Sequence, residues 1–287
     1  METMTQTITA SQVKELRDRT GVGMSKCKEA LEEAHGNMDE AISILRKAGM
    51  ASAVKKQGRE TNEGQISAKE TDEVVAFCEI NAETDFVVKN ERFQEFCKNI
   101  AEEVAATKPA SLEAFMAQNY SKDPSITIDQ YRSLVIQTIG ENIQISRLAV
   151  WQKQKDHSIG IYSHMGGKIL TAVDLSAPGE VELAREVAMH AAAASPEFLA
   201  PNDVPQDTIA KEREIAKGQV EGKPAQIIDK IVEGKVNAYF DQVCLTRQKF
   251  IKDTSISVEA HVQTRAKASG KTCAITRFLR WTVGQAI

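Results

Sequence analysis

An acidic and an aromatic residue stand side by side at Asp85 and Phe86, within the stretch AETDFVVKN (residues 82–90). A carboxylate accepts hydrogen bonds, and an aromatic ring offers a large and rigid contact area. A strand-to-helix loop is usually polar, so a phenylalanine there needs an explanation. Two explanations stay open: Phe86 folds back into the core, or its side chain points outward to contact a partner.

Two other places carry side chains that are unusual for their context. Met24 follows the glycines of TGVGMSK, and His164 stands beside a Gly-Gly turn with Tyr162 two residues earlier on the same strand face. Each has an ordinary structural explanation when taken alone. Exposed methionine and phenylalanine mark interaction surfaces when they cluster, so the three places together favour a binding protein.

Catalytic and cofactor motifs are weak throughout the chain. The Gly21-Val22-Gly23 run has no preceding strand and no third glycine at the dinucleotide spacing, and neither GKPAQ nor GGKIL fits the Walker A frame. The histidines show no HxxxH spacing, and no GxSxG motif occurs. The motifs leave an enzyme open but give no positive indication of one, and we predict no catalytic residues, no cofactor and no metal site.

Composition and charge place the chain among intracellular globular proteins. The net charge is −4, from 36 basic and 40 acidic residues, which gives no general attraction to nucleic acid or to an anionic membrane. The N-terminus lacks the features of a secretory signal, and no window is apolar enough to span a bilayer. The cysteines show no CxxC pair, which predicts buried free thiols in the reducing cytoplasm. They are Cys27, Cys78, Cys97, Cys244 and Cys273.

Asp85 and Phe86 lie between a predicted strand and a predicted helix, and these two elements must position them. Residues 74–80 (VVAFCEI) read as a buried strand that pairs with GQIS as a hairpin, and a helix runs from about Asn90 to Thr107. A second helix ends at Gly140, and residues 142–151 then form a strand. Strands and helices alternate again after residue 156, with two strands around Gly166-Gly167 and the helix EVELAREVAMHAAAAS.

The first 49 residues predict a small module of three short helices. Apolar residues repeat on one face of each helix, and glycine or asparagine stands at the expected ends. Such a module buries little area, so it needs a partner surface. Residues 50–63 are polar and lack an apolar face, which predicts a linker.

Two local matches predict that the core is an internal duplication. ISRLAVW (residues 145–151) parallels ITRFLRW (residues 275–281), and EINA (79–82) parallels DLSA (174–177). The offsets of 130 and 95 require an insertion of about 35 residues in the second copy. Residues 204–241, with a turn at Gly222-Lys223-Pro224, fit a helical hairpin in that place. We expect an α+β fold with core subdomains at 64–155 and 156–287.

Long stretches of the chain closely resemble the bacterial elongation factor Ts family. The most specific are ELRDRTGVGMSKCKEALEEAHGNMDEAISILRKAG and EINAETDFVVKNERFQEF. The likeness continues through IGENIQISR, YSHMGGKI and AMHAAAASPEFL, and so it covers nearly the whole chain.

The resemblance implies a guanine nucleotide exchange factor in protein synthesis that binds GDP-loaded and nucleotide-free elongation factor Tu. It implies a module of the ubiquitin-associated type that docks on the GTPase domain of Tu, followed by two related subdomains, of which the second is of the dimerisation type. The family's TDFV motif falls on Thr84, Asp85, Phe86 and Val87, and it is associated with displacing Mg²⁺ from Tu. Motif matches also imply contacts to Tu by Arg17, Met24 and His164.

Some alternatives stay open at this point. A different class of function is an adaptor whose three-helix module binds another protein and whose core is a scaffold. A nucleic-acid-binding protein is disfavoured by the net charge of −4. The resemblance leaves open a homodimer or a 2:2 complex with Tu, and it implies no direct contact with nucleic acid or membrane. Whether the hairpin, Tyr162 and His164 act on Tu is also left open.

Overall fold

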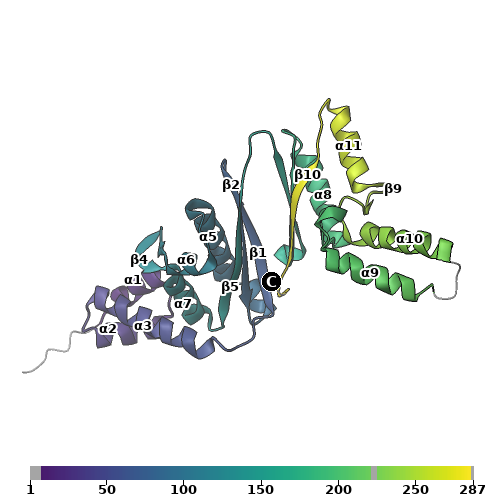
Figure 1. Ribbon diagram of the computed structural model, residues 1–287. Helices are drawn as coiled ribbons and strands as arrows, with labels where there is room; N and C mark the ends of the chain where they lie inside the picture. Colours follow the sequence, from purple (N-terminus) through teal and green to yellow (C-terminus); the bar gives the residue numbers. More distant parts are fainter. Residues whose placement is uncertain (1–7, 221–224, 286–287) are drawn as a thin grey trace, which may run out of the picture. The chain divides into compact units, whose positions relative to one another are not determined.

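The computed structural model describes residues 8–220 and 225–285 and has an α+β fold, as the sequence predicts (Figure 1). It divides into two compact units. Unit 1 comprises residues 8–152 together with residues 283–285, and unit 2 comprises residues 153–282. The finer boundaries between a three-helix module, a linker and two subdomains remain predictions.

Unit 1 begins with three helices that share a small apolar core. Thr9 caps the first helix in a capping box with Gln12, and Gly21 ends it in the left-handed conformation (φ 68°). Asn37 caps the third helix by accepting from the backbone N–H groups of the first turn. Leu16 and Leu31 are fully buried in this core. The helices are α1 (Ala10–Thr20), α2 (Met24–Glu33) and α3 (Met38–Lys56).

The third helix is longer than the sequence predicts. It continues through Lys56, and Ala53 within it is buried, so the prediction that residues 50–63 form a linker without an apolar face is wrong for residues 50–56. The apolar side of this extension packs on α7 (Ile128–Ile139). A Cβ at Gly49 would lie 3.2 Å from Oε1 of Gln137 and 3.4 Å from the backbone oxygen of Ser133, so the two helices are in close contact at this glycine.

A three-stranded antiparallel sheet carries the rest of unit 1. Its central strand β2 pairs with β1 on one side and β5 on the other, and every residue of β2 is buried. Asn90 caps the helix that covers the sheet, and Gly140 (φ 93°) ends α7, as predicted. The elements are β1 (Glu63–Glu70), β2 (Val74–Ala82), α4 (Asp85–Val88), α5 (Glu91–Thr107) and β5 (Ile143–Gln152).

Three short elements between α5 and α7 have no counterpart in the sequence prediction. Tyr120 lies in a two-stranded sheet and stacks on Tyr131 of α7, with ring centroids 4.6 Å apart. Phe115 is fully buried in the main core of unit 1. These elements are too short for periodicity to reveal them. They are α6 (Leu112–Ala117), β3 (Asn119–Tyr120) and β4 (Asp123–Thr127).

Unit 2 contains a second three-stranded antiparallel sheet, with β7 between β6 and β10. Helix α8 lies against β6 and β7, and Gly160 of β6 permits this contact because a Cβ there would lie 2.1 Å from the backbone nitrogen of Arg185. The elements are β6 (Ser158–His164), the 3-10 turn η1 (Met165–Gly167), β7 (Ile169–Leu175), α8 (Val181–Ala194) and β10 (Ile275–Thr282).

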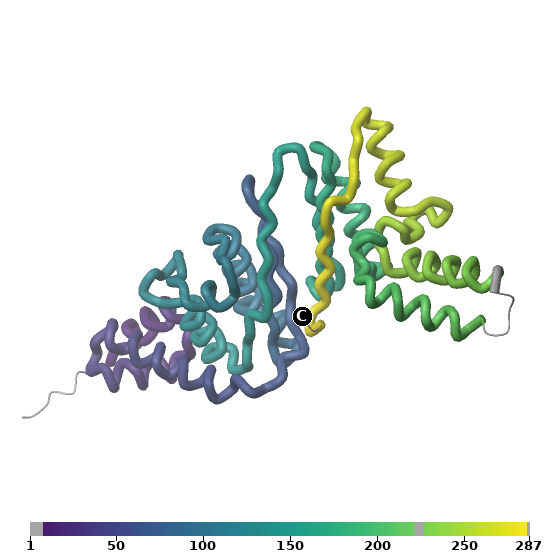
Figure 2. Tube along the Cα trace, viewed as in Figure 1, coloured from purple at the N-terminus to yellow at the C-terminus, as the bar shows by residue number. Residues whose placement is uncertain are grey.

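Two helices come after α8 and pack against each other (Figure 2). They fall in the region predicted as a helical hairpin, and the predicted turn at Gly222-Lys223-Pro224 lies outside the described residues. A short sheet and a helix then lead to β10. These elements are η2 (Pro201–Asp203), α9 (Gln206–Gly218), α10 (Ala225–Val243), β8 (Lys249–Phe250), β9 (Asp253–Ser257) and α11 (Val258–Ala268).

Candidate functional site

The TDFV motif forms a single helical turn rather than a loop. Thr84 is the N-cap of α4, and its hydroxyl accepts a 3.4 Å hydrogen bond from the backbone N–H of Val87. Successive helical residues point about 100° apart, so neighbours in one turn can face opposite environments. Val87 is 8% exposed and packs in the core, whereas Phe86 is 81% exposed. The outward orientation of Phe86 is thereby decided.

Asp85 stands next to Phe86 at the start of the same turn. Its Oδ2 lies 2.8 Å from Nζ of Lys89, and both side chains are substantially exposed. The hydrogen bond to Asp85 raises the pKa of Lys89 above its ordinary value. Solvent screens an exposed ion pair strongly, so Asp85 can exchange Lys89 for a group of a partner at little cost.

Arg17 and Met24 lie near this turn within unit 1. Arg17 is exposed on α1, and Met24, at the start of α2, is 43% exposed. Both line a pocket of about 390 Å³ whose other wall includes Asn90, the residue that caps α5 just after α4. The structure therefore brings two of the predicted contact residues to the segment immediately after TDFV. Arg92 and Ile139 also line this pocket, and the sequence pattern did not single them out.

Polar contacts hold the three helices against the rest of unit 1. Arg92 of α5 donates from Nη1 to the backbone oxygen of Gly21. Arg46 of α3 donates from Nη2 to Ser125 Oγ at 2.9 Å and to Asp123 Oδ2 at 3.3 Å. These contacts, together with α3 on α7, place Arg17 and Met24 with respect to α4.

His164 belongs to unit 2 and is exposed at the end of β6. Its Nδ1 lies 3.3 Å from the hydroxyl of Tyr162, and the two rings are stacked with centroids 6.0 Å apart. Met165 comes next in the left-handed conformation (φ 51°) and is 67% exposed. His164 and Met165 are thus exposed beside the half-buried Tyr162, and the sequence pattern did not single out Met165.

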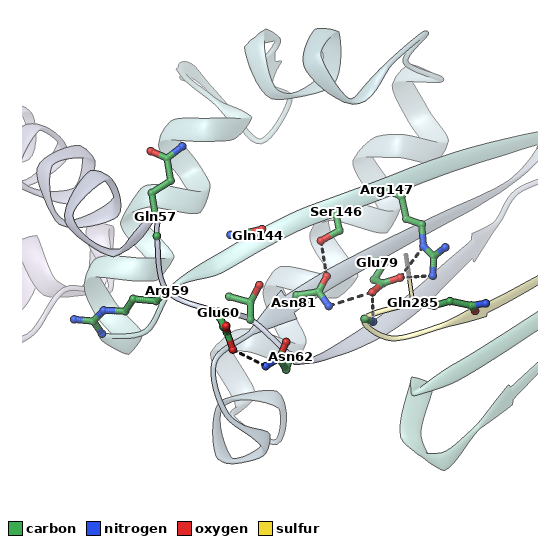
Figure 3. A pocket seen from close by; sticks show the side chains of 13 residues that line it. Gln57, Arg59, Glu60, Asn62, Glu79, Asn81, Gln144, Ser146, Arg147 and Gln285 are labelled. Atoms are coloured by element: carbon green, nitrogen blue, oxygen red, sulfur yellow. Dashed lines mark hydrogen bonds and ion pairs between the residues drawn. The ribbon is translucent and has the colours of Figure 1, made fainter. Parts of the chain in front are cut away.

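A polar pocket of about 530 Å³ lies on the sheet of unit 1 (Figure 3). Glu79 is its most buried acid, and it forms a 2.6 Å ion pair with Nη2 of Arg147. Asn81 donates to Glu79 Oε1 at 3.1 Å and accepts from the hydroxyl of Ser146, and the backbone N–H of Gly284 donates to Glu79 Oε1 at 2.8 Å. These polar groups satisfy one another, so their role is to fasten β2, β5 and residues 283–285 together.

Nucleophilic and metal chemistry find little support in the described residues. All five cysteines are buried free thiols, as predicted, and burial raises the pKa of Cys78 to about 12. No group of three or more His, Cys, Asp or Glu side chains within residues 8–220 and 225–285 could hold a metal ion. Of the helices in those ranges, none combines the length and the apolar character that a membrane span requires.

Comparisons with known proteins agree on one family. The family model described as Elongation factor TS matches residues 83–285, which is more than half of the chain. Elongation factor Ts of Protochlamydia amoebophila (strain UWE25) is 59% identical over 279 residues, covering 97% of this chain and 99% of that protein. Elongation factor Ts of Chlamydia pneumoniae is 44% identical over 273 residues, covering 95% and 97%. The chain therefore belongs to the elongation factor Ts family, the nucleotide exchange factors of elongation factor Tu.

Proposed function

We propose that the α4 turn is the part of this exchange factor that displaces Mg²⁺ from Tu. The carrying observation is the 81% exposure of Phe86 on a turn whose next residue, Val87, is anchored in the core. A large aromatic side chain held outward is costly in water and well suited to insertion between packed elements of a partner. Phe86 acts as a wedge between two helices of Tu.

Asp85 acts beside that wedge. In a P-loop GTPase, Mg²⁺ and the backbone of the phosphate loop together hold the nucleotide phosphates. The exposed carboxylate of Asp85 can leave Lys89 and accept hydrogen bonds from groups of Tu that the wedge displaces. Mg²⁺ then loses its place, GDP leaves, and GTP can enter.

The function requires no covalent chemistry, and an exchange factor is not an enzyme in that sense. It binds nucleotide-free Tu more tightly than GDP-loaded Tu, and linkage requires that it weaken nucleotide binding by the same factor. Arg17 and Met24 contact the GTPase domain from a ubiquitin-associated-type module, and His164 makes a separate contact from unit 2. The protein acts in the cytoplasm. A homodimer and a 2:2 complex with Tu remain alternative assemblies.

The two sheets and their helices support the finer fold proposal, which is a duplicated core. The order hairpin, helix, two-stranded sheet, helix, strand occurs in both units. In this comparison α8 corresponds to α5, and β8 corresponds to β3. The pair α9 and α10 lies between α8 and β8, which is the place expected for an inserted helical hairpin.

The test is the release of a fluorescent GDP from Tu with this protein added. Phe86→Ala should slow the stimulated release about 30-fold, because an interface anchor contributes on the order of 2 kcal/mol. The control Ile251→Ala removes another exposed apolar side chain, 47% exposed in unit 2, and should release GDP at the wild-type rate. Urea unfolding of Phe86→Ala should match the wild type. A wild-type release rate for Phe86→Ala would refute the wedge.

A further inference from the structure

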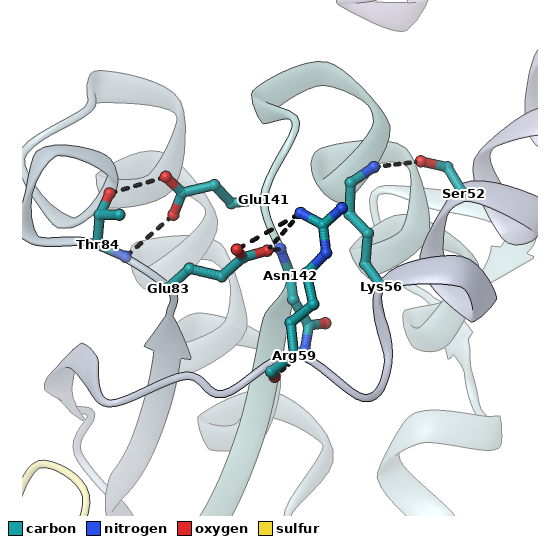
Figure 4. Close-up of polar contacts among 7 residues, drawn as sticks. All are labelled: Ser52, Lys56, Arg59, Glu83, Thr84, Glu141 and Asn142. Carbon is teal, nitrogen blue, oxygen red and sulfur yellow. Dashed lines mark hydrogen bonds and ion pairs between the residues drawn. The ribbon is translucent and has the colours of Figure 1, made fainter.

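Two residues of the IGENIQISR segment have no role in the function proposed so far. Gly140 ends α7 in the left-handed conformation, so the chain leaves the helix at Glu141 and enters β5 through Asn142. Glu141 is half-buried and Asn142 is fully buried. This turn lies against the start of α4, as the polar contacts in Figure 4 show.

Glu141 binds the N-cap residue of α4 with both carboxylate oxygens. The backbone N–H of Thr84 donates to Oε2 at 3.1 Å, and the hydroxyl of Thr84 donates to Oε1 at 2.8 Å. The same hydroxyl accepts from the N–H of Val87, so the carboxylate also orients the oxygen that caps the turn. Hydrogen bonds to an ionised carboxylate are about twice as strong as neutral ones.

The neighbouring residues form a matching contact in the opposite direction, in which an acid beside α4 accepts from the backbone before β5 (Figure 4). Glu83, just before Thr84, accepts from the backbone N–H of Asn142 at 2.6 Å and from Nη1 of Arg59 at 3.3 Å. The side-chain amide of Asn142 donates to the backbone oxygen of Arg59 at 3.0 Å. Two acids, one from each turn, thus bind the backbone of the opposite turn.

The α4 turn needs such support because it is short. An isolated helical turn of four residues does not form stably in water, since nucleation fixes several dihedral angles for one hydrogen bond. Val87 anchors one side of the turn in the core, and the carboxylate of Glu141 anchors its start. A side chain that is already held in its binding orientation avoids part of the entropy cost of association.

We propose that Glu141 is a positioning residue for nucleotide exchange, which holds the Thr84 cap so that Phe86 is presented outward in one orientation. The inference rests on the proposed role of Phe86. Both oxygens of Glu141 accept from Thr84, which gives Glu141 a direct path to act through this turn.

The first experiment measures stimulated release of fluorescent GDP from Tu by Glu141→Ala and Glu141→Gln. Removal of the carboxylate leaves two donors of Thr84 without their acceptor. We therefore expect GDP release from Tu to be about tenfold slower with Glu141→Ala than with the wild type. Glu141→Gln keeps one acceptor oxygen and should fall between that variant and the wild type. A wild-type rate for Glu141→Ala would overturn the proposal.

A double-mutant cycle with Phe86→Ala separates positioning from other effects. Glu141→Ala should slow release less than about twofold in the Phe86→Ala background, because the group that it positions is gone. An equal slowing in both backgrounds would show that Glu141 acts independently of Phe86 and would overturn the inference. Failure of the proposed function itself has a different signature, a wild-type rate in the Phe86→Ala single variant.

Amide hydrogen exchange of the free protein supplies a readout that does not depend on Tu. The amides of Thr84 and Val87 should exchange faster in Glu141→Ala, while those of α5 keep their protection. The matched control is Glu102→Ala, which removes a carboxylate that binds Lys122 at 2.9 Å in the same unit, and it should change neither readout. Unchanged protection of Thr84 combined with slower GDP release would show that Glu141 touches Tu directly, which contradicts a positioning role.

Discussion

The two sheets are built on the same frame. In each, a central strand pairs antiparallel with the preceding strand and with the last strand of its unit. Each central strand carries a buried acid that pairs with an arginine of that last strand. The pairs are Glu79 with Arg147 at 2.6 Å and Asp174 with Arg277 at 2.8 Å. The matching segments found in the sequence carry this ion pair.

The frames differ in the connection that leaves the central strand. After β2 the chain forms the α4 turn and leaves Phe86 in solvent. After β7 it forms a turn at Pro178 and Gly179 that Lys271 of the same unit holds in place. Nζ of Lys271 donates to the backbone oxygen of Pro178 at 2.6 Å and to Oε1 of Glu180 at 3.0 Å. The shared frame therefore does not make the candidate site. The connection after the central strand forms the α4 turn with its exposed Phe86, in unit 1 only.

Removal of either buried acid is the strongest test of the shared frame. Glu79→Ala takes the carboxylate from the largely buried Arg147 and should cost about 3–5 kcal/mol of unfolding free energy. Asp174→Ala should cost less, because solvent reaches the 35% exposed side chain of Arg277. Urea unfolding measures both costs in single-tryptophan backgrounds, Trp281→Phe so that Trp151 of β5 reports on unit 1 and Trp151→Phe so that Trp281 of β10 reports on unit 2. A large loss for one variant and none for the other would break the equivalence of the two pairs.

A side chain at Gly160 tests where the two frames differ in packing. By register, Gly160 pairs with Val173 of β7 as Ser67 pairs with Cys78 of β2. Gly160→Ala places a Cβ against the backbone of α8 and should cost about 3 kcal/mol or more, because overpacking displaces the helix. Ser67→Ala is the control and should cost under about 1.5 kcal/mol. Equal unfolding midpoints for Gly160→Ala and the wild type would contradict the close contact between β6 and α8.

We expect low pH to reduce the stability of unit 2 through a buried histidine that unit 1 lacks among residues 8–152, and this effect is smaller than the preceding ones. His190 of α8 is buried, accepts from the N–H of Ile251 at Nδ1, and pairs through Nε2 with Gln248, and burial lowers its pKa. The only histidine among residues 8–152 is His35, which is exposed.

The unfolded chain therefore binds a proton at His190 that the folded chain resists. Stability of unit 2 should fall as the pH drops below about 6.5, by at most about 1.4 kcal/mol per pH unit for this one proton. Urea unfolding at pH values of about 7.5 and 5.5, on either side of that ordinary histidine pKa, measures the change through Trp281 in the Trp151→Phe background, and His190→Gln should reduce the change. An equal acid-induced loss in His190→Gln would assign it to other groups.

Local sequence signals were sufficient for much of the fold. Asn90 and Gly140 bound the helices that they were predicted to bound, because a cap depends on a residue's own side chain and backbone. The short elements α6, β3 and β4 were missed, and α3 ran past its predicted end because α7 packs on its extension. Such elements depend on contacts that no local window contains.

The sequence by itself determined the family, the caps and the choice of Thr84–Val87 as the candidate site. Only the tertiary structure decided that Phe86 points outward, because its neighbour Val87 takes the place in the core. Only the tertiary structure joined Glu141 to Thr84, which stand 57 positions apart. The spacing of apolar residues describes neighbours along the chain. The orientation of one side chain depends instead on which distant groups the fold brings beside it.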